Sequence, residues 1–157
     1  MKIYLGLVRF TLLVSLLSSP LSIAAISTID DLSFGTIAVV NNDTNSDITI
    51  NTAGSIIITN HIRVITPGHR GEYVLSSYPA YTQLFTTVSV IQAQTTSPAP
   101  GSEQFTLVSI DTAPSVTTDV SGTATVLVGG TFRTSGSGTG QYNDTLYSTS
   151  MELSVNY

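Results

Sequence analysis

The sequence predicts an all-β protein, an antiparallel β-sandwich of about seven to nine strands. After residue 25, β-branched runs recur between clusters of Gly, Pro, Asn and Asp, which is the pattern of short strands joined by turns. No stretch of that part keeps a helical period over three turns. Charged residues make up only 10% of the chain, but 41% of residues are hydrophobic, so the chain can bury a core and is not of the disordered class.

Each expected strand is a β-branched or apolar run bounded by turn residues. In chain order they are Leu32–Val40, Asp47–Thr52, Ser55–Ile65, Glu72–Ser76, Phe85–Gln92, Gln104–Ile110, Thr123–Phe132 and Leu146–Tyr157. The last one alternates most clearly, with Met151, Leu153, Val155 and Tyr157 on one face and polar residues on the other. A period of two is what a strand with one buried face requires.

The N-terminus has the organisation of a secretory signal peptide. Met1–Arg9 is basic, Phe10–Leu17 is mostly apolar, and Pro20 ends the run. Small residues then favour cleavage after Ala24, with Ala25 as second choice. The apolar run is shorter than the about 20 residues of a membrane-spanning helix. We therefore expect residues 1–24 to be a signal peptide, residues 25–157 to form one β-sandwich domain, and the membrane to be met only during export.

Composition excludes several classes of function. The chain has no Cys, so it has no disulfides, thiol nucleophile or Cys-ligated metal. Loss of Lys2 and Arg9 with the signal peptide takes the net charge from −5 to −7, which disfavours nucleic acid and anionic membranes as partners. Thr and Ser occupy outward strand positions where Lys and Glu are usual, so we expect this surface to meet other protein copies or partners.

Candidate sites for metals have weak support. Asp43, Asn45 and Asp47 space oxygen ligands as a calcium loop begins, but the glycine and the final glutamate of such a loop are missing. His61 and His69, the two histidines, would need a carboxylate such as Glu72 to complete a site. We read these residues as turn, loop and strand positions, and expect no metal or cofactor.

Catalytic motifs are also incomplete. Asp111-Thr112-Ala113 is similar to an aspartic-protease loop, but no second copy exists and Pro114 follows it. No Gly-x-Ser-x-Gly elbow is present, which disfavours a hydrolase. The glycine-rich stretch Gly136–Gly140 lacks the lysine and the helix of a phosphate loop and is expected to be a flexible turn. The sequence therefore predicts no catalytic residue and a protein that is not an enzyme.

The tyrosines offer an alternative function. Tyr73, Tyr78 and Tyr81 lie near Pro79 in sequence, and Tyr142 and Tyr147 flank the last loop. Aromatic residues of sandwiches more often complete the core, but exposed ones can bind ligands. The alternative is thus a monomeric periplasmic or secreted binding module that uses tyrosine-rich loops for a glycan or a protein.

Four short motifs occur along the chain in a characteristic order. They are Leu32-Ser33-Phe34-Gly35-Thr36-Ile37, then Val126-Leu127-Val128-Gly129-Gly130-Thr131-Phe132, then Gly140-Gln141-Tyr142, and finally Leu153-Ser154-Val155-Asn156-Tyr157. This order resembles the bacterial family called "domain of unknown function 4402", over most of the chain after residue 25. The residues that carry the likeness are Phe34, Gly35, Gly129, Gly130, Gly140, Tyr142, Val155 and Tyr157. A glycine pair inside a strand indicates a bulge or a close backbone approach.

The resemblance implies an exported, immunoglobulin-like β-sandwich of Gram-negative bacteria with no assigned activity, found in the periplasm, at the cell surface or secreted. It is also similar in pattern to spore-coat-protein-U-like subunits and to pilins of chaperone–usher systems, which assemble by β-strand addition. Its partners would then be other copies of itself and a periplasmic chaperone and usher. The expected assembly strands contain Ile26, Ile29, Leu32 and Phe34 at the N-terminal side and Met151, Leu153, Val155 and Tyr157 at the C-terminal side.

Overall fold

The computed structural model describes residues 24–157, so the predicted signal peptide falls almost wholly outside the described residues. Within this range every regular element is a strand, and all pairings between strands are antiparallel. The predicted all-β sandwich is confirmed. No helix in residues 24–157 is long and apolar enough to cross a membrane.

The described chain forms eleven strands. They are β1 (Ala25–Asp30), β2 (Thr36–Val39), β3 (Asp47–Ile50), β4 (Ile56–Ile58), β5 (Ile62–Thr66), β6 (Gly71–Ser76), β7 (Gln83–Val90), β8 (Thr106–Thr112), β9 (Ser115–Thr117), β10 (Ala124–Arg133) and β11 (Met151–Asn156).

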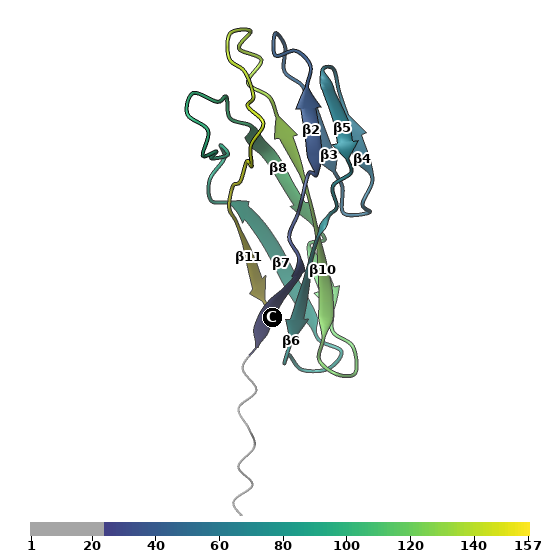
Figure 1. Ribbon diagram of the computed structural model, residues 1–157. Coiled ribbons are helices and arrows are strands. Elements are labelled where there is room, and N and C mark those ends of the chain that lie inside the picture. Colours follow the sequence, from purple (N-terminus) through teal and green to yellow (C-terminus); the bar gives the residue numbers. More distant parts are fainter. Residues whose placement is uncertain (1–23) are drawn as a thin grey trace, which may run out of the picture.

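The largest sheet is built around β10, the longest strand, and has the order β1-β6-β10-β3-β4 with β8 also paired to β10. Strand β6 pairs with residues 124–128 of β10 and β3 with residues 130–133, while β8 pairs with residues 128–133. Because β8 overlaps both partners in register, β6 and β3 follow one another along one edge of β10 and β8 takes the other edge. Figure 1 shows β10 running the length of the molecule between these strands.

Two smaller sheets complete the fold. Strands β11, β7 and β9 form one, and β2 and β5 form the other. The chain passes from β8 in the large sheet to β9 in the second through Ala113 and Pro114. In Figure 1, β11 and β7 lie side by side, and β2 and β5 pair towards the opposite end of the molecule from the start of β1.

The core consists of two apolar clusters. Buried residues of β6, β7 and β10 form the first: Tyr73, Leu75, Leu84, Ala124, Val126 and Val128. The second lies under β2, β3 and β5 and contains Phe34, Ile48, Ile50 and Ile62. Leu32 packs against both clusters and so connects them. The alternation of buried and less buried residues along β6 and β10 is the period of two that the sequence predicts.

Two of the predicted strands are wrong in extent. The run Ser55–Ile65 is not one strand, because the chain turns at Asn60, whose φ is +49°, and so divides into β4 and β5. The run Leu32–Val40 is strand only at β2, because Gly35 has a φ of +74° and interrupts the extended backbone. Continuous β-branched composition hides such turns, since an Asn in a left-handed conformation ends a strand without a Gly-Pro signal.

The structure also contains strands that the prediction omits or extends. Strands β1 and β9 were not among the predicted strands, and Leu146–Ser150 lies outside β11, apart from a single bridge between Ser148 and Thr96. Residues Met151, Leu153 and Val155 do share one half-buried face, as predicted. The omitted strands are short or exposed, so burial leaves little periodic signal in their sequences.

Candidate functional site

A large open groove runs between the two ends of the described chain. It has a volume of about 1310 Å³ and is walled on one side by residues from Ile26 to Val39 and on the other by residues from Tyr142 to Leu153. Its floor contains apolar side chains from β8 and β10, among them Leu107, Ile110 and Phe132. The groove therefore exposes part of the sandwich interior between the two walls.

Each wall of this groove includes a strand with one unpaired edge. Strand β1 pairs only with β6, and β11 pairs only with β7, among residues 24–157. The backbone N–H and C=O groups on the other edge of each strand have no backbone partner in that range. Edges of this kind are templates for another strand.

Strand β1 pairs with β6 but buries none of its side chains. All six of its residues are exposed, with Ile26 at 44% and Ile29 at 57% of full exposure. Its register with β6 is interrupted at Ile29, between the pairs Thr28–Tyr73 and Asp30–Glu72. The side chains of Ile26 and Thr28 line the groove, so their exposure is exposure to this open space.

The C-terminal wall presents alternate apolar side chains. Met151, Leu153 and Val155 are half-buried against the first core cluster, while Glu152 and Ser154 are exposed. Met151 and Leu153 also line the groove. The predicted C-terminal assembly strand therefore lies at the groove, except that Tyr157 follows β11 and is 72% exposed.

The predicted N-terminal assembly residues divide into two groups. Ile26 and Ile29 lie on the exposed β1. Leu32 packs against both core clusters, and Phe34 is 9% exposed and stacks on Phe132 with ring centroids 4.1 Å apart. Only the first pair can leave this chain without opening its core.

An aromatic cluster closes one end of the groove. Phe105 lies at its centre, 4.3 Å from the Tyr142 ring and 5.0 Å from the Tyr147 ring between centroids, and it also stacks near Phe132. The Tyr142 hydroxyl accepts a hydrogen bond from the Ser135 N–H and donates to the Gln104 carbonyl. Burial raises the pKa of Tyr142 above its ordinary value. These tyrosines are structural parts of the wall rather than a free ligand face.

The remaining motif glycines make space for neighbours. A Cβ on Gly129 would lie 2.5 Å from the Ile50 carbonyl oxygen, which is the close backbone approach that the glycine pair predicts. A Cβ on Gly130 would come within 3.1 Å of the Leu32 side chain. Gly140 does not have a positive φ; its missing side chain leaves room for Glu103.

In the predicted turn at residues 43–47, the two carboxylates are engaged with neighbouring side chains and do not converge as ligands of one cation. Asp47 binds Arg133 through two hydrogen bonds, Nε to Oδ1 at 2.7 Å and Nη2 to Oδ2 at 2.8 Å. This hydrogen bonding lowers the pKa of Asp47 below its ordinary value. Asp43 instead faces the His61 ring at 3.4 Å.

The other candidate metal-binding and catalytic residues do not come together in one site. Within residues 24–157, no three His, Asp or Glu side chains lie close enough together to hold a metal ion. His69 bridges to Ser33 through its backbone, and its ring faces the Arg70 carbonyl. Asp111 pairs with Gly129 within the β8–β10 ladder, as expected for a strand end.

Asn42, which the sequence analysis does not single out, organises the glycine-rich loop. The Asn42 side chain is nearly buried and donates to Ser135 Oγ at 2.9 Å, while its Oδ1 accepts from the Gly136 N–H at 3.0 Å. The Gly138 N–H donates to the Asn42 carbonyl. The stretch Gly136–Gly140 is therefore fastened to this asparagine, a contact that sequence spacing does not reveal.

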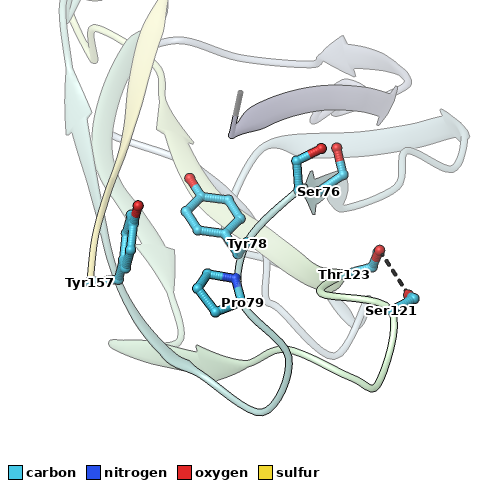
Figure 2. A pocket seen from close by; sticks show the side chains of 7 residues that line it. Ser76, Tyr78, Pro79, Ser121, Thr123 and Tyr157 are labelled. Atoms are coloured by element: carbon cyan, nitrogen blue, oxygen red, sulfur yellow. Dashed lines mark hydrogen bonds between the residues drawn. The ribbon is translucent and has the colours of Figure 1, made fainter. Parts of the chain in front are cut away.

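A second, smaller pocket lies at the far end of the sandwich. It has a volume of about 610 Å³ and is lined by Ser76, Ser77, Tyr78, Pro79, Ser121, Thr123 and Tyr157. Figure 2 shows the Tyr78 ring between Tyr157 and the hydroxyls of Ser76 and Thr123. The two tyrosine rings meet edge to face, with centroids 5.2 Å apart.

The tyrosines that are close in sequence are not together in this pocket. Tyr73 belongs to the core and its hydroxyl faces Asp31, and its pKa is raised by burial and by that carboxylate. Tyr81 is 73% exposed and lies outside the pocket lining. The partner of Tyr78 is Tyr157, which is far away in sequence and which the sequence analysis assigned to assembly.

Comparison with known proteins adds no assignment: no family model, no curated protein and no solved structure matches this chain. The resemblance to the domain of unknown function 4402 family stays a prediction.

Proposed function

We propose that this protein is an exported, non-enzymatic structural subunit, of the pilin-like or cell-surface kind, that assembles by β-strand addition. The observation that carries the proposal is the open apolar groove between the unpaired edges of β1 and β11. An extended segment placed there can bond to the free backbone groups of an edge and bury alternate side chains on the groove floor.

The character of the surface supports this proposal. Half-buried apolar residues of β8 and β11, such as Ile110 and Leu153, face the groove and would be covered by the added strand. Covering apolar area is favourable by about 25 cal/mol per Å². A monomer leaves that gain unused, whereas an assembled subunit obtains it.

The donor that fits best is the segment Ala25–Ile29 of another copy. It is fully exposed, its register is interrupted at Ile29, and its release leaves both core clusters intact. A periplasmic chaperone would offer a strand of its own to the same groove before assembly. Export itself is tested by cell fractionation, with and without residues 1–24.

The experiment uses two variants of the mature chain that each remove one half of the contact. Leu153→Glu places a charge at the groove on a half-buried side chain, where an added strand would desolvate it further, and circular dichroism checks that the variant is folded. Ser154→Glu is the matched control, because it adds the same charge to the exposed face of β11. Deletion of Ala25–Ile29 removes the donor together with the β1 side of the groove, and keeps the β11 edge and the apolar floor as the acceptor.

Assembly is measured by light scattering after size exclusion and by electron microscopy of the cell surface. We expect wild type and Ser154→Glu to form multimers or surface fibres, and each of the other two variants to stay monomeric. Mixing the deletion variant with Leu153→Glu should give a one-to-one dimer, since one retains the acceptor and the other the donor. A monomeric wild type without surface fibres, or a Leu153→Glu variant that assembles normally, would contradict the proposal.

A further inference from the structure

We infer that the pocket between Tyr78 and Tyr157 is a binding site for a neutral saccharide. This site is separate from the groove and goes beyond assembly. Every side chain that lines it is uncharged and either bears a hydroxyl or is cyclic: Ser76, Ser77, Tyr78, Pro79, Ser121, Thr123 and Tyr157. A sugar ring has matching chemical features, because its C–H faces are apolar and its edges carry hydroxyl groups.

The aromatic part of the site is exposed and available. The Tyr157 ring meets the Tyr78 ring edge to face, with centroids 5.2 Å apart, and Tyr157 remains 72% exposed. In Figure 2 the Tyr157 ring stands at the outer side of Tyr78. Tyrosine combines an apolar ring with a hydroxyl, so it can stack on a sugar face and hydrogen bond at its rim.

The hydroxyls that surround the pocket have unused bonding capacity. The side chains of Ser76 and Ser77 and the hydroxyls of Tyr78 and Tyr157 make no hydrogen bond within residues 24–157. They lie at the surface, where water satisfies them, and a polyhydroxyl ligand can replace that water. These four free hydroxyls, two on the tyrosine rings and two on the neighbouring serines, are the small number of polar groups that can fix a ligand's orientation.

The walls of the pocket are held rigidly by two interlocked turns. The Thr118 hydroxyl donates to the Pro79 carbonyl at 2.7 Å and accepts from the Thr82 N–H at 2.8 Å. The Tyr78 N–H donates to the Gly122 carbonyl at 3.2 Å. This framework fixes the tyrosine before any ligand arrives, which lowers the entropic cost of binding.

The opposite turn is fixed by Asp119. Its carboxylate accepts from the N–H groups of Ser121 and Thr123 at 2.8 and 3.0 Å and from the Ser121 hydroxyl at 2.6 Å. These bonds lower the pKa of Asp119 below its ordinary value. The carboxylate is thereby engaged in its own turn, and no charged side chain lines the pocket.

Backbone strain gathers at the same place. Ser77 has a φ of +67° and Tyr81 a φ of +55°, and neither is a glycine. Residues in this left-handed region cost free energy, and such residues cluster at ligand sites. Ser77 lines the pocket and directly precedes Tyr78, whereas Tyr81 lies outside the lining.

The test is titration of the ¹⁵N-labelled mature protein with methyl glycosides of glucose, galactose, mannose and N-acetylglucosamine, followed by NMR. Sialic acid serves as a charged comparison. We expect at least one neutral glycoside to shift the amide signals of Ser76–Tyr78 and Ser121–Thr123, and sialic acid to shift them less. Removing the ring with Tyr157→Ala should weaken that binding by about tenfold.

Controls separate stacking from damage to the fold. Tyr81→Ala removes an equally exposed tyrosine from the same end of the molecule and should change affinity less than about twofold. Tyr157→Phe keeps the ring and should bind more tightly than Tyr157→Ala. Unchanged amide signals elsewhere show that each variant is folded.

The inference is overturned if none of the four glycosides shifts the pocket amides, if the shifts lie elsewhere on the sandwich, or if sialic acid binds more tightly than all four. It is also overturned if Tyr81→Ala weakens binding as much as Tyr157→Ala. Because the readout needs only the monomer, it is independent of whether the groove accepts a strand.

Discussion

Replacing Gly35 with alanine should destabilise the protein far more than the same replacement at Gly101. The two glycines have nearly the same backbone conformation, with φ of +74° and +71°. Their surroundings differ. A Cβ on Gly35 would overlap the Thr66 carbonyl oxygen and lie 2.6 and 2.7 Å from Gly68 N and Pro67 C, whereas a Cβ on Gly101 would have nothing within 4 Å.

The magnitude follows from two contributions. A left-handed conformation costs an alanine about 1–2 kcal/mol, offset by about 0.4–1 kcal/mol from the reduced freedom of the unfolded chain, so Gly101→Ala should cost about 1 kcal/mol. At Gly35 the same cost applies, and backbone atoms must also move apart. Overpacking of this kind adds about 1–3 kcal/mol, which gives a total of about 2–4 kcal/mol.

Urea unfolding of both variants and wild type, followed by circular dichroism, measures these costs. For a chain of this size, 1 kcal/mol corresponds to about 3–5 °C in Tm, so thermal unfolding gives a second measure. Equal losses at the two positions would refute the reasoning, because they would show that the conformational cost alone decides the outcome and that the approach of residues 66–68 to Gly35 is not tight.

Three other predictions concern stability. Ile48→Ala should cost about 2–5 kcal/mol because the side chain is fully buried, whereas Ile57→Ala on the neighbouring strand should cost less than about 1 kcal/mol; chemical denaturation that gives equal losses would contradict the described packing. Arg133→Met should lower the Tm at pH 7, and the deficit should shrink as the pH falls below 3.8. The reason is that the folded pKa of Asp47 is depressed, so the ion pair stabilises the fold above the unfolded pKa and is lost on acidification; a pH-independent deficit would contradict this. Asn42→Ala should speed proteolysis within the glycine-rich loop that this side chain fastens, as mass spectrometry of the first cleavage products would show; cleavage unchanged from wild type would count against that role.

The sequence predicts most accurately the strands with buried alternate residues, and it misses the exposed β1 and the three-residue β9. The runs that became β6 and β10 alternate because every second side chain enters the core. Strand β1 is exposed along its whole length, so its composition carries no such period. Its pairing with β6 depends on backbone contacts, which side-chain patterns do not encode.

The candidate sites show the same division. The alternation of Met151, Leu153 and Val155 was legible, and the structure places this face half-buried at the groove or against the core. The groove forms because residues 26–39 and 142–153 lie on either side of the apolar side chains of β8 and β10 and leave them uncovered. This long-range arrangement leaves no pattern in the local sequence. The pairing of Tyr78 with Tyr157 joins residues 79 positions apart (157 − 78), so sequence proximity grouped Tyr78 with the wrong tyrosines.

The free edges of the sheets differ in how well they are protected against pairing with another strand, and the least protected edges are the best candidates for binding a partner strand. Natural sheets blunt their free edges with short strands, charges, prolines or bulges. Strand β4, at the far end of the large sheet, has three residues and so offers little to a new strand. Strands β1 and β11 have six residues each, contain no lysine or proline, and carry one charged residue apiece, Asp30 and Glu152. The bulge at Ile29 twists one end of β1, but β11 pairs with β7 without a register shift. Strands β1 and β11 are thus two weakly protected six-residue edges, and both lie at the apolar groove. An added strand would pair there, so substitutions on one face of β11 should separate assembly from folding.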